Sequence, residues 1–280
     1  MKTLSDARPL VGIVVPTVDN AFFSSLADHA ERYLYEKGYT ALILSSANNA
    51  EKEKEHLRSL YAAGVAGILC VSGLSALPEN LLPEDLPLVW VDRQPQSQRE
   101  IPCVANDDRA AMAEATEYLI QKGCHNILLL PGYLAEMRTS PRVVGYEEAL
   151  KKHGITPTPA YILNRAGQKP SETETGELVR AILAQGLPVD AIITSSDRAA
   201  FGVMTVLHEV GLYVPEDVKL ISFDNSPYST MASPAITALD RRPQELAESA
   251  CAHLLSLLRG ETVPALTITP VSLIKRDSTR

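Results

Sequence analysis

The feature that most constrains the fold is a repeated alternation of short apolar runs with longer segments of helical spacing. The first run, residues 10–15, is rich in β-branched residues, as is typical of a strand buried on both faces of a parallel sheet. Pro16 ends it, and Asn20 can cap the helical pattern that follows. Similar runs recur at 40–44, 66–71, 88–91, 126–130, 191–194 and 218–223. This order predicts an α/β protein with two doubly wound lobes, each built on a parallel sheet.

Length and charge narrow the class of protein further. A chain of 280 residues is long enough for two domains of ordinary size, and 45% hydrophobic with 21% charged residues is an ordinary globular composition. The formal net charge of −8 argues against this chain binding a polyanion such as DNA by itself.

The cysteines and the ends of the chain bear on cofactors and location. The four cysteines are widely spaced and form no CxxC pair or Cys/His cluster, so we expect buried free thiols, no metal site and no cofactor. The N-terminus has no apolar signal core, and no apolar run reaches membrane-spanning length. These observations predict a cytoplasmic protein without a membrane partner.

Polar and aromatic side chains follow the first predicted strand. Asn20, Phe22 and Phe23 come just after its carboxyl end, which is where open α/β sheets bind ligands. The turn lacks a glycine-rich phosphate loop and offers one amide and two aromatic faces, which suits a hydroxylated ring better than a nucleotide. The alternative is that the two phenylalanines are core residues of the first helix.

Other strand ends carry further polar groups, and a helix start in the second half adds one more. Fixed acceptors and bidentate donors are present, but we find no nucleophile with its base, no GxSxG and no HExxH. The set predicts a hydrogen-bonding site rather than an enzyme. Purely structural roles stay open as alternatives, namely helix capping for Asp197, turn capping for Asp224 and a surface ion pair for Arg93. The residues are Asp92, Arg93, Arg142, Ser196 with Asp197, and Asp224.

Seven stretches in the same order resemble the effector-binding core of the lactose-repressor (LacI) family, and through it the periplasmic ribose-binding proteins. They are GIVVPTVDNAFFSSL, VAGIL, PLVWVDR, VANDDRAAMAEATEYLIQKGCHNI, the R-x-x-G-Y-x-x-A-L at residues 142–150, SSDRAAFGVMTVLHEVGLYVPEDVKLISFDN, and SPAITALDRRPQELAESA. The resemblance runs from about Leu10 to the end of the chain.

The resemblance implies roles for the strand-end residues. The positions matching Arg142 and Asp224 hold sugar hydroxyls, and the aromatic positions matching Phe22 and Phe23 sandwich the sugar ring. A second group, Asn20, Asp92 and Arg93, matches sugar-contacting positions of ribose-binding proteins.

Two positions depart from the family pattern. Ser196 stands where these relatives commonly have Asn, and Arg241 stands where Gln is common. The added guanidinium of Arg241, together with Arg138 as a further candidate near the site, would allow an acidic or phosphorylated sugar as the ligand as well as a neutral one.

The resemblance also implies the domain organisation, a periplasmic-binding-protein-like pair of lobes joined by a three-strand hinge. We expect a residual linker at 1–9, an N-terminal lobe of 10–124 with 241–270, and a C-terminal lobe of 125–240 with 271–280. The helix-turn-helix headpiece of the family is absent from this chain, so operator DNA would be bound only through that missing part. The chain crosses between lobes near Gly123, Leu239 and Pro270.

The function implied is the effector-binding and dimerising core of a LacI-type transcriptional regulator. A sugar bound in the inter-lobe cleft would favour lobe closure and so change operator affinity. The core would form a homodimer through the helix at 49–63 and the segment 228–237, with Leu57, Tyr61 and Met231 as apolar contacts. The alternative is a sugar-binding protein of an ABC transporter, which would need a signal peptide.

Overall fold

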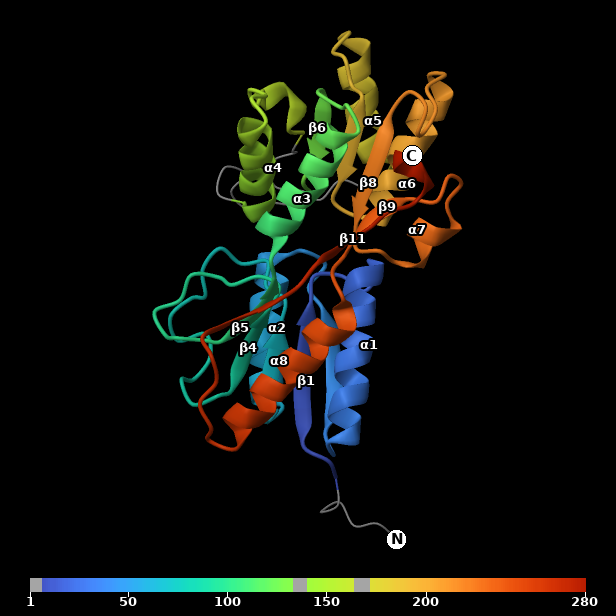
Figure 1. The fold of residues 1–280 in the computed structure, drawn as a ribbon. Coiled ribbons are helices and arrows are strands. Elements are labelled where there is room, and N and C mark those ends of the chain that lie inside the picture. The colour runs from blue at the N-terminus through green and yellow to red at the C-terminus, as the bar shows by residue number, and fades with distance from the viewer. Residues whose placement is uncertain (1–6, 133–139, 164–171) are drawn as a thin grey trace. The chain divides into compact units, whose positions relative to one another are not determined.

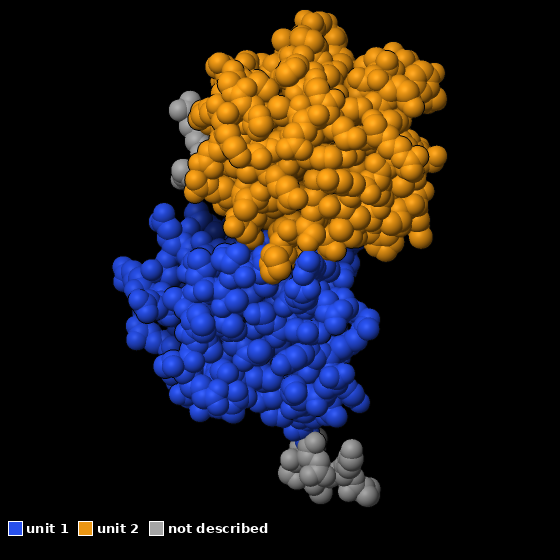
Figure 2. Space-filling view, in the orientation of Figure 1, with its two compact units in different colours: residues 1–106, 242–269 blue, residues 107–241, 270–280 orange. Residues whose placement is uncertain are grey.

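The computed structural model describes residues 7–132, 140–163 and 172–280. The chain forms two compact units, one of residues 1–106 with 242–269 and one of residues 107–241 with 270–280 (Figure 2). The chain therefore passes from one unit to the other three times.

Unit 1 is built on a six-stranded, fully parallel sheet in the order β10-β5-β4-β3-β1-β2 (Figure 1). Helices α1 and α8 pack together on one face, and α2 packs on the other. The elements are β1 (Leu10–Val15), α1 (Ala21–Glu36), β2 (Thr40–Ser45), α2 (Ala50–Ala62), β3 (Gly67–Cys70), β4 (Leu88–Val91), β5 (Cys103–Asn106), α8 (Pro243–Leu258) and β10 (Leu266–Thr269).

Strand β1 shows why the apolar run of the sequence had to be continuous. Its side chains alternate between two cores, because Ile13 and Val15 pack with α1 and α8 whereas Val14 packs with α2. All three are 3% exposed or less. A Cβ at Gly12 would lie 2.5 Å from a methyl carbon of Leu60, so glycine lets α2 approach the strand closely.

Unit 2 is built on a five-stranded sheet in the order β11-β9-β8-β7-β6, parallel except for β11. Helices α3 and α4 pack with one core of this unit and α5 and α6 with the other. The elements are α3 (Asp108–Gln121), β6 (Ile127–Leu130), α4 (Pro141–Lys152), α5 (Glu172–Ala184), β7 (Ala191–Thr194), α6 (Asp197–Glu209), β8 (Lys219–Phe223), α7 (Pro227–Met231), β9 (Thr237–Asp240) and β11 (Ser272–Ile274), with 3-10 turns at Pro159–Tyr161 and Asp277–Thr279.

The fold class predicted from the sequence is confirmed, and the structure adds several details. Beyond the apolar runs recognised in the sequence, residues 237–240 form β9, and the C-terminal residues 266–274 contain β10 of unit 1 and antiparallel β11 of unit 2. A 3-10 turn at Pro159–Tyr161 is followed by a single bridge from Ile162 to Leu129. Helix α3, which we expected in the N-terminal lobe, belongs to unit 2 because it packs against α4.

Candidate functional site

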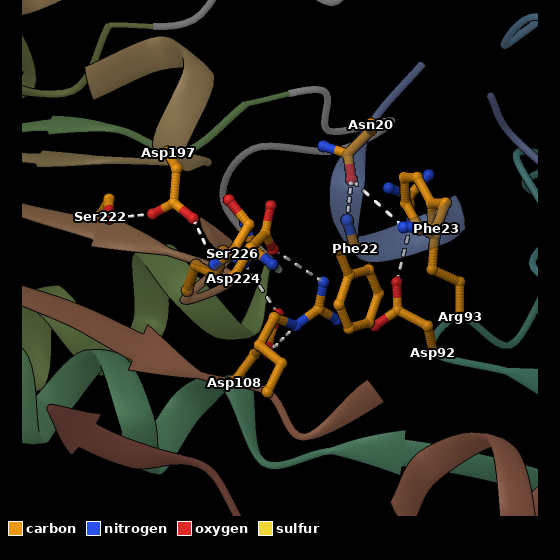
Figure 3. A network of polar contacts seen from close by, with 12 residues as sticks. Asn20, Phe22, Phe23, Asp92, Arg93, Asp108, Asp197, Ser222, Asp224 and Ser226 are labelled. Atoms are coloured by element: carbon orange, nitrogen blue, oxygen red, sulfur yellow. Dashed lines mark hydrogen bonds and ion pairs between the residues drawn. The ribbon is translucent and has the colours of Figure 1, made fainter. Parts of the chain in front are cut away.

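In unit 1, Asn20 begins α1 as the sequence predicts. Its side-chain Oδ1 accepts hydrogen bonds from the backbone N–H groups of Phe22, at 2.9 Å, and Phe23, at 3.3 Å. The amide nitrogen of Asn20 points away from these two groups (Figure 3). The side-chain oxygen of Asn20 is thus used in capping the helix, and its side-chain nitrogen is directed away from the capped N–H groups.

Phe22 and Phe23 are both core residues of unit 1, which is the alternative that the sequence left open. They are 2% and 5% exposed, and their rings meet edge to face with centroids 5.3 Å apart. Their role as a clamp on a sugar ring stays a prediction.

Asp92 and Arg93 follow β4 and lie beside the aromatic pair. Asp92 has a φ of 68°, a left-handed conformation that is uncommon for a residue other than glycine. Its carboxylate lies 3.6 Å from the Nε of Arg93, whose guanidinium carbon is 5.7 Å from the centroid of the Phe23 ring. Unit 1 therefore gathers all five of its candidate residues at the carboxyl ends of β1 and β4.

In unit 2, a chain of alternating charges links four side chains. Asp108, the first residue of α3, accepts a 2.7 Å hydrogen bond from the Nε of Arg142 on α4. The Nε of Arg241, which follows β9, lies 3.8 Å from the other oxygen of Asp108. The Nη1 of Arg241 lies 3.6 Å from the carboxylate of Asp224. Arg142, Asp224 and Arg241, named separately from the sequence, are thus joined through Asp108.

This charge chain is largely buried. Arg241 is 3% exposed and Asp224 7%, although charged residues are rarely buried unless they are paired. The guanidinium of Arg142 also stacks on Phe223, with its central carbon 3.9 Å from the ring centroid. The hydrogen bond to Asp108 and the contact with Phe223 thus orient the Arg142 guanidinium.

Asp197 departs from the capping role considered for it. The Oγ of Ser196 caps α6 by accepting from the N–H of Ala199 at 3.2 Å. The Asp197 carboxylate turns instead to β8 and its following turn, where it accepts from the Ser222 hydroxyl and, at 2.6 Å, from the backbone N–H of Ser226 (Figure 3). Burial raises the pKa of Asp197 to about 6, and nearby Asp224 adds a smaller effect in the same direction.

Sequence reasoning missed two of these contributors. Asp108 was not singled out from the sequence, and its neighbour Asp107 caps α3 by accepting from the N–H of Ala110 at 2.9 Å. Ser226 was not considered, although it adjoins Asp224 and Asn225, which both have positive φ. Arg138 lies outside the described residues. The Asp-Asp pair after the strand at 103–106 was the available signal for Asp108.

The described part of the chain offers neither a metal cluster nor a membrane-spanning helix. Among those residues, no group of three or more His, Cys, Asp or Glu side chains could hold a metal ion. No helix within the same ranges is long and apolar enough to cross a membrane.

The fold and these strand-end clusters define a two-unit α/β protein of the binding-protein class. Residues 8–277 match the family described as periplasmic binding proteins and sugar binding domain of LacI family. The chain belongs to this family.

Individual relatives agree with this assignment. The chain is 26% identical over 273 residues to a ribose operon repressor of Halalkalibacterium halodurans, covering 97% of this chain and 80% of that protein. It is 29% identical over 254 residues to the transcriptional repressor PurR of Vibrio atlanticus, covering 90% and 75%. A periplasmic binding protein/LacI transcriptional regulator from Alkaliphilus metalliredigens, solved with D-xylulofuranose, superposes with a TM-score of 0.85 at 26% identity, covering 97% and 99%.

Proposed function

We propose that this chain is the effector-binding core of a LacI-type transcriptional regulator, and that its effector is a monosaccharide. The observation that carries the proposal is the charge chain of unit 2, in which Arg142 donates a hydrogen bond to Asp108 and Asp224 lies within ion-pair distance of Arg241. A guanidinium donates a fork of hydrogen bonds, and a carboxylate accepts from two hydroxyls. Adjacent hydroxyls of a sugar present both complements.

The charges favour a neutral sugar over an acidic or phosphorylated one. Arg142 and Arg241 are each within 4 Å of a carboxylate, Asp108 in the first case and both Asp108 and Asp224 in the second. Two guanidiniums facing two carboxylates leave no excess positive charge for an anion, and Asp197 nearby adds negative charge when it ionises. The departure of Arg241 from the family pattern is thereby compensated inside the protein.

We propose further that sugar binding favours one arrangement of the chain over others, and only to the extent of its differential affinity for that arrangement. If a DNA-binding headpiece responds to that arrangement, sugar and operator affinities change reciprocally. This is the regulatory mechanism we infer for the whole regulator.

The relatives support a regulator over the other classes of function. The ribose operon repressor and the PurR proteins are named as repressors, not as enzymes or transport components. All four cysteines are free and buried, which fits a reducing compartment such as the cytoplasm. A binding protein of an ABC transporter is therefore the less supported alternative.

Calorimetric titration with a defined panel tests the proposal. We expect D-ribose or D-xylulose to bind with micromolar affinity, and D-ribose 5-phosphate and AMP to bind at least about tenfold more weakly because the guanidiniums are already paired. Tighter binding of the phosphorylated sugar would overturn the neutral assignment. Binding of AMP alone would overturn the sugar assignment.

A further inference from the structure

The C-terminal segment 276–280 has no role in the site described so far, yet it contacts the turn that carries Asp224. The guanidinium of Arg276 donates from Nη2 to the side-chain Oδ1 of Asn225 at 2.5 Å, and from Nη1 to the carbonyl oxygen of Ile236 at 2.7 Å. A weaker contact of 3.4 Å joins Nη1 to the hydroxyl of Ser229. Arg276 therefore ties the turn after β8 to the start of β9.

The turn needs such support because of its backbone. Asp224 and Asn225 have φ values of 96° and 53°, so two consecutive residues other than glycine adopt a conformation that L side chains rarely take. Strand pairing holds one side, since the N–H of Asp224 donates to the carbonyl of Leu239 at 3.0 Å. Beyond the turn, the N–H of Ser226 donates to Asp197. Between these two anchors, Asn225 is held through its side chain by Arg276.

The C-terminal segment itself is firmly placed in unit 2. Ser278 is fully buried, donates from its hydroxyl to the carbonyl of Leu220 at 2.5 Å, and accepts from the N–H of Thr237 at 2.8 Å. The backbone N–H of Arg276 donates to the hydroxyl of Thr237 at 2.9 Å. The backbone that carries the Arg276 side chain is therefore held in place by hydrogen bonds to unit 2.

We propose that Arg276 is a positioning residue for ligand binding, which fixes Asn225 and through it the orientation of the Asp224 carboxylate. This inference rests on the proposed function of Asp224 as a ligand of sugar hydroxyls. Because the three acceptors of Arg276 in the described chain are uncharged oxygens, its hydrogen-bond geometry rather than an ion pair does the positioning.

The experiment compares Arg276→Gln with Arg280→Gln. Arg280 is a matched control on the same segment, because its guanidinium is exposed and pairs with Asp277 at the surface. We expect Arg276→Gln to weaken D-ribose binding about tenfold, as the loss of a hydrogen bond from a charged donor would. In an Asp224→Asn background, Arg276→Gln should cause no further loss, because the carboxylate it positions is gone. An equal loss in both backgrounds would overturn the proposal.

Amide hydrogen exchange provides a second readout that needs no ligand. We expect Arg276→Gln to speed exchange in peptides covering residues 222–232 and to leave peptides covering β6 unchanged, whereas Arg280→Gln changes neither. Unchanged exchange in the turn, or an equal rise throughout unit 2, would overturn the positioning role. If the wild-type protein binds no D-ribose, the sugar assignment fails and the exchange result alone decides the role of Arg276.

Discussion

Asp108 and Arg142 form a 2.7 Å ion pair between the first turns of α3 and α4, with side chains only 18% and 14% exposed. This pair joins residues 34 positions apart and orients a guanidinium that the family resemblance predicts to contact the ligand. A second pair, Arg109 with Glu148, joins the same two helices but is exposed to solvent.

The two pairs should differ in their contribution to stability. Asp108→Ala leaves two largely buried guanidiniums, Arg142 and Arg241, without this carboxylate, and should lower the free energy of unfolding by roughly 1–3 kcal/mol. Glu148→Gln removes only the exposed pair and should cost less than about 1 kcal/mol. Urea unfolding measures both, and equal losses would contradict this ranking.

Asp224→Asn should weaken sugar binding by at least about tenfold, since it removes a charged acceptor of sugar hydroxyls. Titration calorimetry gives the affinity, and thermal unfolding shows whether the fold is intact. Asp217→Asn is a suitable control in the same unit, because the Asp217 carboxylate accepts from a loop N–H, that of Tyr213, away from the charge chain. If Asp224 only caps its turn, the variant will lose thermal stability and keep its affinity.

Asp197 should make the protein less stable as pH rises from about 4 to 6. Its pKa is raised from 3.8 to about 6, so within that interval the folded state binds more protons than the unfolded state. Its stabilising effect is full below the unfolded pKa and is lost as pH rises to the folded pKa, on the order of 3 kcal/mol in all.

Asp197→Asn cannot titrate and should lack this fall. Chemical unfolding at pH 4, 5, 6 and 7 yields the difference between the two proteins, which should shrink or change sign with rising pH. A difference that stays constant across the series would refute the buried position of the Asp197 carboxylate.

The four thiols should be unreactive in the native protein. Burial raises the pKa of Cys103 and Cys251 to about 12 and that of Cys124 to about 11, and it also raises the pKa of Cys70. Since the thiolate is the nucleophile, a thiol reagent at pH 8 should react slowly until guanidinium exposes all four. One rapidly reacting equivalent before unfolding would show an accessible cysteine.

We propose that the chain forms a homodimer, and that two of the three apolar contacts expected from the sequence take part in it. Leu57 is fully buried in the core of unit 1 and is not available to a partner, whereas Tyr61 and Met231 are 52% and 77% exposed. Met231→Asp should therefore shift the mass measured by light scattering from dimer toward monomer at low micromolar concentration. Val18→Asp, at a position 55% exposed outside the expected interface, should not.

The sequence by itself determined the order of strands and helices and several of their ends. Asn20 caps α1, and glycines such as Gly123 and Gly211 have φ values of 86° and 79° just beyond α3 and α6. These features depend on neighbouring residues alone, through apolar spacing, side-chain capping and the freedom of glycine at positive φ. They also placed most candidate residues at strand ends.

Only the tertiary structure decided which of these residues meet. Asp108 contacts both Arg142 and Arg241, and Arg241 lies 133 positions after Asp108 in the chain. Arg276 contacts Asn225, which lies 51 positions before it. The tertiary structure likewise assigned α3 to unit 2 and placed β10 and β11 in different sheets. Local spacing cannot encode such pairings, because they arise when packed helices and sheet order bring distant side chains together and burial then forces charges to find partners.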